Sequence, residues 1–180
     1  MKTTLKEKKL RCQARPTSRG DARVVTDIEL IPTVVKIKSI LVPTDFSPPS
    51  EKALKYALKF AEQFGATVTL LHVIEQVVVP ELGMVPLVAT NELTDAAKNR
   101  LERWAKEEGL QIETKTAVEV GQPFYQITET ARDLKVDLII IATHGYSGLK
   151  HIFLGSTAER VARHAPCPVL IVRDKEREFV

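Results

Sequence analysis

Cysteine is scarce in this chain: two residues among 180 cannot build a disulfide framework. Cys12 lies in a basic stretch near the N-terminus, and Cys167 stands between two prolines before the last apolar run. We expect both thiols to be free, which is typical of proteins in a reducing cytoplasm. The chain also lacks the run of about 18 apolar residues that a membrane span needs, and its N-terminus lacks the apolar segment of a secretory signal. The sequence therefore predicts a cytoplasmic protein without a membrane segment.

Two familiar nucleotide-binding signatures are missing as well. No GxxxxGK[ST] segment occurs, which excludes a P-loop NTPase by motif, and no GxGxxG follows the first expected strand, which disfavours a Rossmann-type dinucleotide fold. Metal-ligand spacing is also missing, because His144 and His151 are seven residues apart across a loop without a cysteine or aspartate cluster. We expect no histidine-based metal site, and we expect His72 and His164 to be structural or surface residues.

Charge is unevenly distributed along the chain. Residues 1–23 carry a net charge of +6, whereas the remaining residues carry −3. A mildly acidic folded part does not favour a surface for nucleic acid. We expect a basic, disordered extension over residues 1–33, an α/β domain over residues 34–175 and a short tail over residues 176–180. For the extension, a transit peptide, a polyanion-binding arm and a start codon placed too far upstream are alternatives to a dispensable tail.

After residue 34 the hydrophobic pattern alternates between the periods of a strand and a helix. Strands are predicted over residues 34–42, 66–74, 111–119, 136–142 and 168–173. Helices are predicted over residues 91–108, 124–134 and 155–164, and over a first segment that Ser47 or Ser50 caps and that ends at Phe64 before Gly65. The expected buried faces of the first two helices contain Ala53, Tyr56, Ala57, Phe60, Ala61 and Phe64, and Leu93, Ala97, Leu101, Trp104 and Ala105.

Strands that alternate with helices predict a three-layer α/β/α fold, with helices on both faces of a mainly parallel, doubly wound, five-stranded sheet. In the strand order 3-2-1-4-5, the first and fourth strands are neighbours at the point where the winding reverses. Ligands of such sheets bind beyond the carboxyl ends of these strands. The first strand ends in Thr44 and Asp45, and the fourth ends in a glycine-bearing loop that opens a helix. We expect these loops to meet and form a nucleotide pocket, because amide groups at a helix N-terminus favour an anion.

Four segments carry a family resemblance. They read VPTDFSPPSEKAL, LLHVI, ATHGYSGLKHIFLGSTAERV and CPVLIV in chain order. In this order and at these intervals they resemble the universal stress protein family over roughly residues 38–174. The resemblance implies an α/β domain of the nucleotide-binding type that is often a homodimer, and the family includes an ATP-binding subgroup.

The ATP-binding subgroup has the pattern G-x2-G-x9-G-[ST]. The corresponding residues in this chain are Ala142, Gly145, Gly155 and Ser156, with both intervals intact. Alanine in place of the first glycine adds one methyl group where ribose or adenine approaches the backbone. An alanine is tolerated there unless its φ is positive.

The resemblance also implies a nucleotide site. Its residues are Pro43, Thr44, Asp45, Val73, Ala142, His144, Gly145, Gly155, Ser156 and Thr157. The Asp45 carboxylate can accept from an adenine amino group or a ribose hydroxyl, and Val73 offers backbone groups to the adenine edge. The glycines, Ser156 and Thr157 surround the phosphates with N–H and hydroxyl donors, and His144 lies at the pocket entrance. Capping of the following helix by Asp45, plain strand packing by Val73 and an N-cap at Ser156 are the structural alternatives.

These observations predict an ATP-binding regulatory protein of the stress response, with Mg²⁺ or Mn²⁺ accompanying ATP. The loop offers donors but no dedicated base, so slow hydrolysis is the most we expect. Ordering of residues 146–154, and of residues 75–90, around ATP would change the surface offered to an unidentified protein partner. The apolar residues 77–88 are a candidate lid or interface. A nucleotide-free interaction protein of the same fold, and a slow ATPase or other enzyme, are the alternatives.

The last strand suggests how two copies of the chain assemble. Val169–Val172 is apolar and lies at the edge of the predicted sheet, where unpaired backbone groups are a liability. Pairing of two such edges across a two-fold axis would form a homodimer, which the resemblance also implies. A single edge shielded by the charged residues 173–178 is the alternative.

Overall fold

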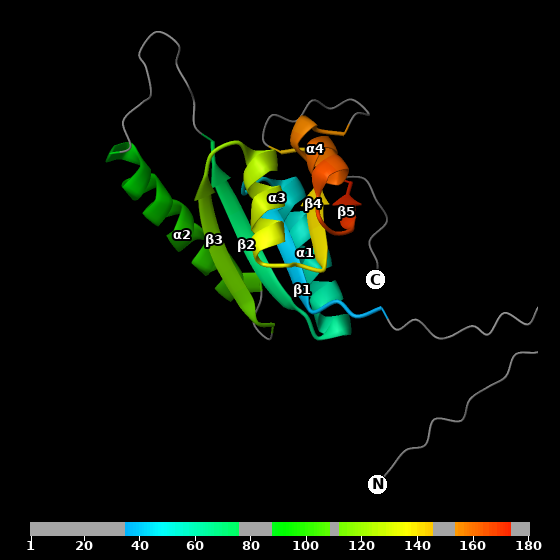
Figure 1. The fold of residues 1–180 in the computed structure, drawn as a ribbon. Helices are drawn as coiled ribbons and strands as arrows, with labels where there is room; N and C mark the ends of the chain where they lie inside the picture. Colours follow the sequence, from blue (N-terminus) through cyan, green and yellow to red (C-terminus); the bar gives the residue numbers. More distant parts are fainter. Residues whose placement is uncertain (1–34, 76–87, 109–111, 146–153, 174–180) are drawn as a thin grey trace, which may run out of the picture. The chain divides into compact units, whose positions relative to one another are not determined.

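The computed structural model describes residues 35–75, 88–108, 112–145 and 154–173, in which strands and helices alternate (Figure 1). The strands are β1 (Ser39–Thr44), β2 (Thr67–Ile74), β3 (Thr114–Val120), β4 (Leu138–Ala142) and β5 (Val169–Val172). The helices are α1 (Pro48–Phe64), α2 (Val88–Glu108), α3 (Pro123–Asp133) and α4 (Ser156–His164). The predicted extension over residues 1–33 and tail over residues 176–180 lie outside the described residues.

The five strands form one parallel sheet in the order β3-β2-β1-β4-β5. Helices α1 and α2 pack on one face of the sheet, and α3 and α4 pack on the other (Figure 1). The predicted three-layer, doubly wound fold is therefore confirmed, including its strand order. Among the described residues, no helix combines the length and the apolarity that crossing a bilayer requires.

Consecutive residues of the central strands pack into two separate hydrophobic cores, one on each face of the sheet. Ile40 and Val42 of β1 pack with α1 in one cluster, whereas Leu41 between them packs with α3 and α4 in the other. The same alternation holds in β4, where Ile139 and Ile141 face α3 and α4. All five of these side chains are buried, as expected for a parallel sheet covered on both faces. This double burial explains why the strands read as continuous apolar runs.

Helix α1 begins and ends at residues that the sequence marks. Ser47 is the N-cap: its side chain accepts from the backbone N–H of Ser50, and two prolines occupy the first turn, where no intrahelical donor is needed. Gly65 ends the helix in the left-handed conformation at φ 66°, and its N–H donates to the carbonyl of Ala61. Of the two predicted caps, Ser47 is therefore the one used.

Some local predictions are wrong. The first strand begins at Ser39 rather than at residue 34 and continues to Thr44, and β3 begins at Thr114 rather than at residue 111. Phe64 and Leu93 were expected on buried helix faces, but they are 40% and 54% exposed because each lies near a helix end, beyond the reach of the sheet. Trp104 packs against the α1-side core as predicted. Cys167 is free, and Cys12 lies outside the described residues.

Asp137 fixes the relative position of β1 and β4 at the amino edge of the sheet. One carboxylate oxygen accepts from the N–H groups of Lys38 and Ser39 at 2.8 and 3.0 Å and from the Ser39 hydroxyl at 3.2 Å. The Asp137 N–H donates in return to the Ser39 carbonyl at 3.0 Å. The backbone hydrogen bond from Lys38 is the main cause that lowers the pKa of the Asp137 carboxyl, because it stabilises the charged form.

We predict that Asp137→Asn lowers the free energy of unfolding at neutral pH. The loss should be below about 1 kcal/mol, because the carboxylate is exposed and solvent screens it. Since its pKa is lowered in the folded state, Asp137 stabilises the protein above the ordinary aspartate value of about 3.9, and this contribution disappears as the pH falls through the folded-state pKa.

Urea unfolding at several pH values measures this effect. The difference between wild type and Asp137→Asn should shrink as the pH falls below about 3.9. Asp95→Asn on α2, another exposed aspartate, is the matched control and should keep the wild-type midpoint. A wild-type midpoint for Asp137→Asn at pH 7 would contradict this interpretation.

Candidate functional site

A cavity of about 390 Å³ opens at the carboxyl edge of the sheet, where β1 and β4 end side by side. The ten residues predicted for nucleotide binding all line it: Pro43, Thr44, Asp45, Val73, Ala142, His144, Gly145, Gly155, Ser156 and Thr157. The fold thus brings together segments that are about 100 residues apart in the sequence. Contact of these residues with a nucleotide stays a prediction.

The cavity is also lined by eight residues that the sequence did not identify. They are Ser50, Leu71, Glu75, Pro123, Ile127, Ile141, Thr143 and Ala158. Most are apolar and come from β2, α3, β4 and α4, so the cavity is lined by apolar side chains together with hydroxyls and carboxylates. Their periodic spacing predicts burial, but no sequence signal tells which buried residue borders a cavity. An apolar lining with a few polar groups is the usual character of a small-molecule site.

The Asp45 carboxylate supports the start of α1 from inside the cavity wall. Its Oδ1 accepts from the Ser47 N–H at 3.0 Å and from the Ser47 hydroxyl at 2.5 Å. The Ser50 hydroxyl donates to the Ser47 carbonyl at 2.8 Å and lies 3.0 Å from the Thr44 hydroxyl oxygen. The alternative that Asp45 caps the following helix is thus wrong, because Ser47 is the N-cap and Asp45 accepts hydrogen bonds from Ser47.

Gly145 lets the loop after β4 approach Asp45. A Cβ atom added at Gly145 would overlap the second carboxylate oxygen of Asp45, Oδ2. A side chain at this position would therefore displace the Asp45 carboxylate, so glycine keeps the two loops in close approach. The contact joins the two loops that the sequence predicted to meet.

Gly155 opens helix α4 beside the same loop. Its N–H donates to the Thr143 carbonyl at 2.8 Å, and a Cβ atom added to it would lie 2.7 Å from that oxygen. Gly155 is the N-cap and no side chain caps the helix, so the alternative of an N-cap at Ser156 is wrong. Ser156 is exposed and Thr157 half-buried at the cavity. The first turn of α4 therefore faces the cavity with its backbone amides and two hydroxyls, a suitable arrangement for an anion.

Ala142 occupies the first position of the glycine pattern in ordinary backbone geometry. It pairs with Val172 of β5 and does not belong to the described non-glycine residues with positive φ. Its methyl group is buried and packs in the core cluster beneath α1, whereas its neighbour Ile141 packs on the opposite face. The extra methyl group therefore extends into the core on the α1 side of the sheet.

Phe46 has a strained backbone that the sequence did not reveal. Its φ of 63° lies in the left-handed region, which costs a bulky residue about 1–2 kcal/mol. The N–H of Phe46 donates to the Thr44 hydroxyl at 2.9 Å, and the ring packs 4.6 Å from the His72 ring between centroids. His72 in turn donates from Nδ1 to the Thr44 carbonyl at 2.8 Å, which fits its predicted structural role.

No group of three or more histidine, cysteine or acidic side chains able to hold a metal ion occurs among the described residues. His144 lines the cavity, and its Nδ1 lies 3.0 Å from the Thr143 hydroxyl. His164 is exposed on α4. His151 lies outside the described residues, as do the loop over residues 146–153 and the candidate lid except for its last residue, Val88, where α2 begins.

Comparison with known proteins gives a consistent result. The model of the universal stress protein family matches residues 36–173. The universal stress protein MJ0577 of Methanocaldococcus jannaschii is 37% identical over 158 residues, which cover 78% of this chain and 98% of that protein. Its solved structure superposes with a TM-score of 0.68 at 40% identity, over 79% of this chain and all of that one.

Two more distant structures share the fold. A universal stress protein in complex with cAMP is 24% identical, with a TM-score of 0.58, and covers 77% of this chain and 98% of its own. The universal stress protein from Archaeoglobus fulgidus in complex with dAMP is 19% identical, with a TM-score of 0.56, over 77% of this chain and 99% of its own. At these identities the likeness concerns the fold.

We predict that Gly155→Ala destabilises the protein by about 1–3 kcal/mol, because the added methyl group must displace the Thr143 carbonyl. Thermal unfolding measures the effect as a lower midpoint. Ser156→Ala, at the next residue, removes only an exposed hydroxyl and should unfold like the wild type. Equal midpoints for wild type and Gly155→Ala would show that the loop after β4 adapts freely.

Proposed function

The chain belongs to the universal stress protein family, and from this premise we propose that it is an ATP-binding regulatory protein. The observation that carries the proposal is the convergence of the Asp45 carboxylate and the first turn of α4 on one cavity that apolar side chains also line. A ribose needs a hydrogen-bond acceptor such as this carboxylate, and a base needs apolar surface. A phosphate chain needs donors such as those of a helix N-terminus.

Each part of an adenine nucleotide finds a matching group in the cavity. Leu71, Val73 and Ile127 offer apolar surface to the base, and the backbone of Val73 can meet its polar edge. Asp45 can accept from a ribose hydroxyl. The amides and hydroxyls at the start of α4 can donate to phosphate oxygens, and the helix dipole favours their charge.

The volume of the cavity agrees with a ligand of this kind. About 390 Å³ falls within the usual range of small-molecule sites. The cAMP and dAMP complexes indicate that the fold accommodates adenine nucleotides, although a shared fold by itself does not assign a function. The proposal therefore depends mainly on the residues of the cavity.

A nucleotide-free interaction protein is the principal alternative, and its main support in the sequence is Ala142, which stands where the ATP-binding pattern has its first glycine. Ala142 lines the cavity, but it is also a buried member of the α1-side core and its φ is ordinary. An alanine at this position therefore causes no backbone strain and is compatible with nucleotide binding.

A regulatory role fits the cavity better than catalysis does. The described lining residues include no lysine or arginine to stabilise charge on a γ-phosphate, and Asp45 already accepts two hydrogen bonds from Ser47. We therefore propose that Mg²⁺ or Mn²⁺ accompanies ATP to offset its charge, and that hydrolysis is slow or absent. Binding would order the loop after β4 and alter the surface offered to a protein partner in the cytoplasm.

We predict that Asp45→Asn weakens ATP binding about tenfold, or about 1.4 kcal/mol. Asparagine keeps the size of aspartate and one carbonyl acceptor, but it loses the negative charge and the second acceptor oxygen. Asp137→Asn, at the opposite edge of the sheet, is the matched control and should bind ATP like the wild type. Calorimetric titration with ATP and Mg²⁺ measures both affinities.

Adenosine, AMP and ATP should bind with increasing affinity if the phosphates lie at the start of α4. Equal affinities would place the phosphates in solvent. Absence of binding in protein shown to be free of co-purified ligand would favour the nucleotide-free alternative, and turnover at enzyme-like rates would favour an enzyme.

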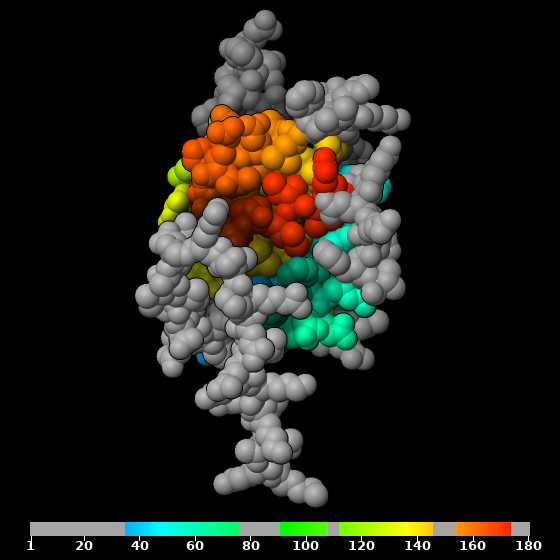
Figure 2. All heavy atoms as spheres, turned by 90° about the vertical axis from the view of Figure 1, so that its right-hand side faces the viewer, coloured from blue at the N-terminus to red at the C-terminus, as the bar shows by residue number. Residues whose placement is uncertain are grey.

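We also propose a homodimer that pairs the outer edges of two β5 strands. Strand β5 pairs with β4 alone among the described strands, and it lies at the surface between α4 and α1 (Figure 2). Ile139 and Thr143 of the β4 segment donate to Pro168 and Val172. The backbone N–H and C=O groups of successive residues in a strand point in alternate directions. Those of Ile171, which lies between Leu170 and Val172, therefore point away from β4.

We predict that Ile171→Pro shifts the dimer towards monomer in sedimentation experiments at micromolar protein. Proline removes one outward donor and leaves the hydrogen bonds with β4 intact. Ile171→Val keeps the donor and the apolar character, so it should sediment like the wild type. A wild-type protein that is entirely monomeric at this concentration would refute the proposed dimer.

A further inference from the structure

The Phe46 ring is held by three side chains from β2 and α2 that do not themselves line the cavity. His72 of β2 lies 4.6 Å from the ring and Trp104 of α2 lies 5.7 Å away, between centroids. The guanidinium carbon of Arg100, one turn before Trp104 on α2, lies 4.1 Å from the ring centroid. We call Phe46 with His72, Arg100 and Trp104 the Phe46 clamp. None of its members lines the cavity.

The clamp surrounds Phe46, which is one of two described non-glycine residues with a positive φ and the one that lies next to the cavity. A left-handed Phe persists only where its surroundings hold it, and such residues gather at functional sites. The two residues that flank Phe46 are Asp45, which lines the cavity, and Ser47, which caps α1. Any relaxation of φ at Phe46 would therefore move the carboxylate and the helix start together.

His72 holds this turn at two points. Its ring packs on Phe46, and its Nδ1 donates to the Thr44 carbonyl at 2.8 Å. The N–H of Phe46 donates to the Thr44 hydroxyl at 2.9 Å, and the N–H of Ser47 donates to Asp45 at 3.0 Å. The four residues from Thr44 to Ser47 are thus fixed by hydrogen bonds on the cavity side and by the clamp on the side of α2.

Arg100 distinguishes this arrangement from ordinary core packing. Its side chain belongs to an exposed residue of α2 and adds no apolar core, yet its charge lies over the face of Phe46. A cation over an aromatic face is attracted by the ring electrons and restricts the ring. Phe46 itself packs only at the margin of the α1-side core.

We propose that Phe46 is a positioning residue, through which α2 and β2 hold the Asp45 carboxylate against Gly145 at the cavity. The inference rests on the proposed function only for the identity of the ligand, ATP. The clamp itself also has an effect that can be measured in the ligand-free protein. Because α2 holds the turn through Phe46, substitutions on α2 change the site from outside it.

Amide hydrogen exchange of the ligand-free protein tests the clamp directly. In an Arg100→Met, Trp104→Leu double variant, the amides of Phe46 and Ser47 should exchange about tenfold faster than in the wild type. The Gly155 amide, which donates to the Thr143 carbonyl in the other loop, is the internal control and should exchange at the wild-type rate. Unchanged exchange at Phe46 and Ser47 would overturn the proposal.

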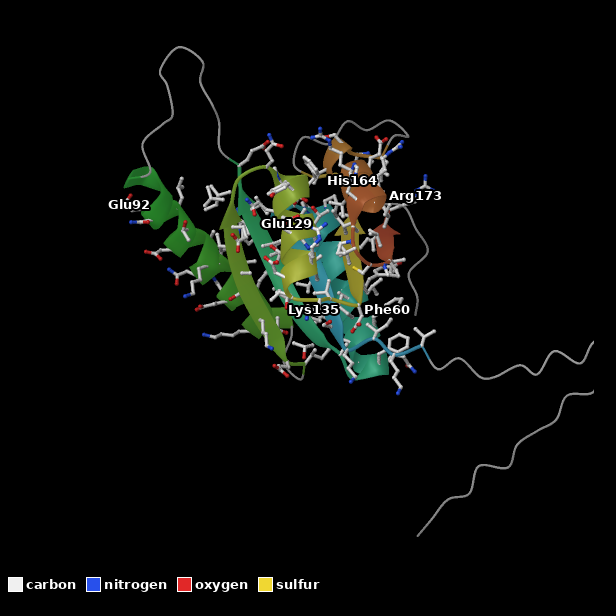
Figure 3. The ribbon with its side chains drawn as sticks, viewed as in Figure 1. Phe60, Glu92, Glu129, Lys135, His164 and Arg173 are labelled. Carbon is white, nitrogen blue, oxygen red and sulfur yellow. The ribbon has the colours of Figure 1, made fainter. Side chains whose placement is uncertain are left out.

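Calorimetric titration with ATP and Mg²⁺ tests the effect on the site. Phe46→Leu should bind ATP about tenfold more weakly while still folded, and Phe46→Tyr, which keeps the ring, should bind within about twofold of the wild type. Phe60→Leu is the matched control, because Phe60 packs on the same core from α1 but lies towards the opposite edge of the sheet (Figure 3). It should lose stability without losing affinity.

The two readouts separate the possible failures. Wild-type affinity in Phe46→Leu, or an equal loss in Phe60→Leu, would reduce Phe46 to a core residue and overturn the positioning role. If the wild-type protein does not bind ATP, the proposed function fails, and the exchange rates alone then decide whether the clamp holds the turn.

Discussion

The parallel pairing of β1 with β4 is the constraint on which the site depends. These strands are neighbours in the sheet although α1, β2, α2, β3 and α3 separate them in the sequence. After β1 the chain turns to one face of the sheet and after β4 it turns to the other, because α1 and α4 pack on different faces. Neither connection can fill the space between these two turns. The cavity is the direct consequence, and Asp137 fixes the same strand pair at the other edge of the sheet.

The wall of this cavity is rigid because its polar groups are satisfied within the chain. Thr44, Ser47 and Ser50 are buried and linked by hydroxyl hydrogen bonds, and every buried side-chain nitrogen or oxygen of the described residues has a partner. A buried network that is fully satisfied holds one geometry, whereas a partly satisfied one would not. The strained φ of Phe46 persists in this setting. A ligand that meets such a wall needs to order few of its groups, which reduces the entropic cost of binding.

Glycine and alanine have separate physical roles in the loop pattern. At Gly155 a Cβ atom would meet the backbone carbonyl of Thr143, and at Gly145 it would displace the Asp45 carboxylate, whose Oδ2 occupies that space. At Ala142 the Cβ atom lies in the α1-side core, where a methyl group fills space that a glycine would leave to its neighbours. The pattern is therefore best understood by the contact that each position makes, and a departure from it matters only where the added atoms meet the ligand or the opposite loop.

The sequence by itself determined the order of elements and ten of the residues at the cavity, and with a strand order taken from doubly wound sheets it placed the site beyond the first and fourth strands. It could do so because burial on both faces makes apolar runs of the strands, because Ser47 and Gly65 mark the ends of α1, and because ligands of doubly wound sheets bind where the strand order reverses. Only the tertiary structure decided which apolar side chains, such as Ile127 and Leu71, line the cavity. It also decided that Phe46 is left-handed and that His72, Arg100 and Trp104 hold it, since these contacts join residues from three distant segments and leave no local pattern in the chain.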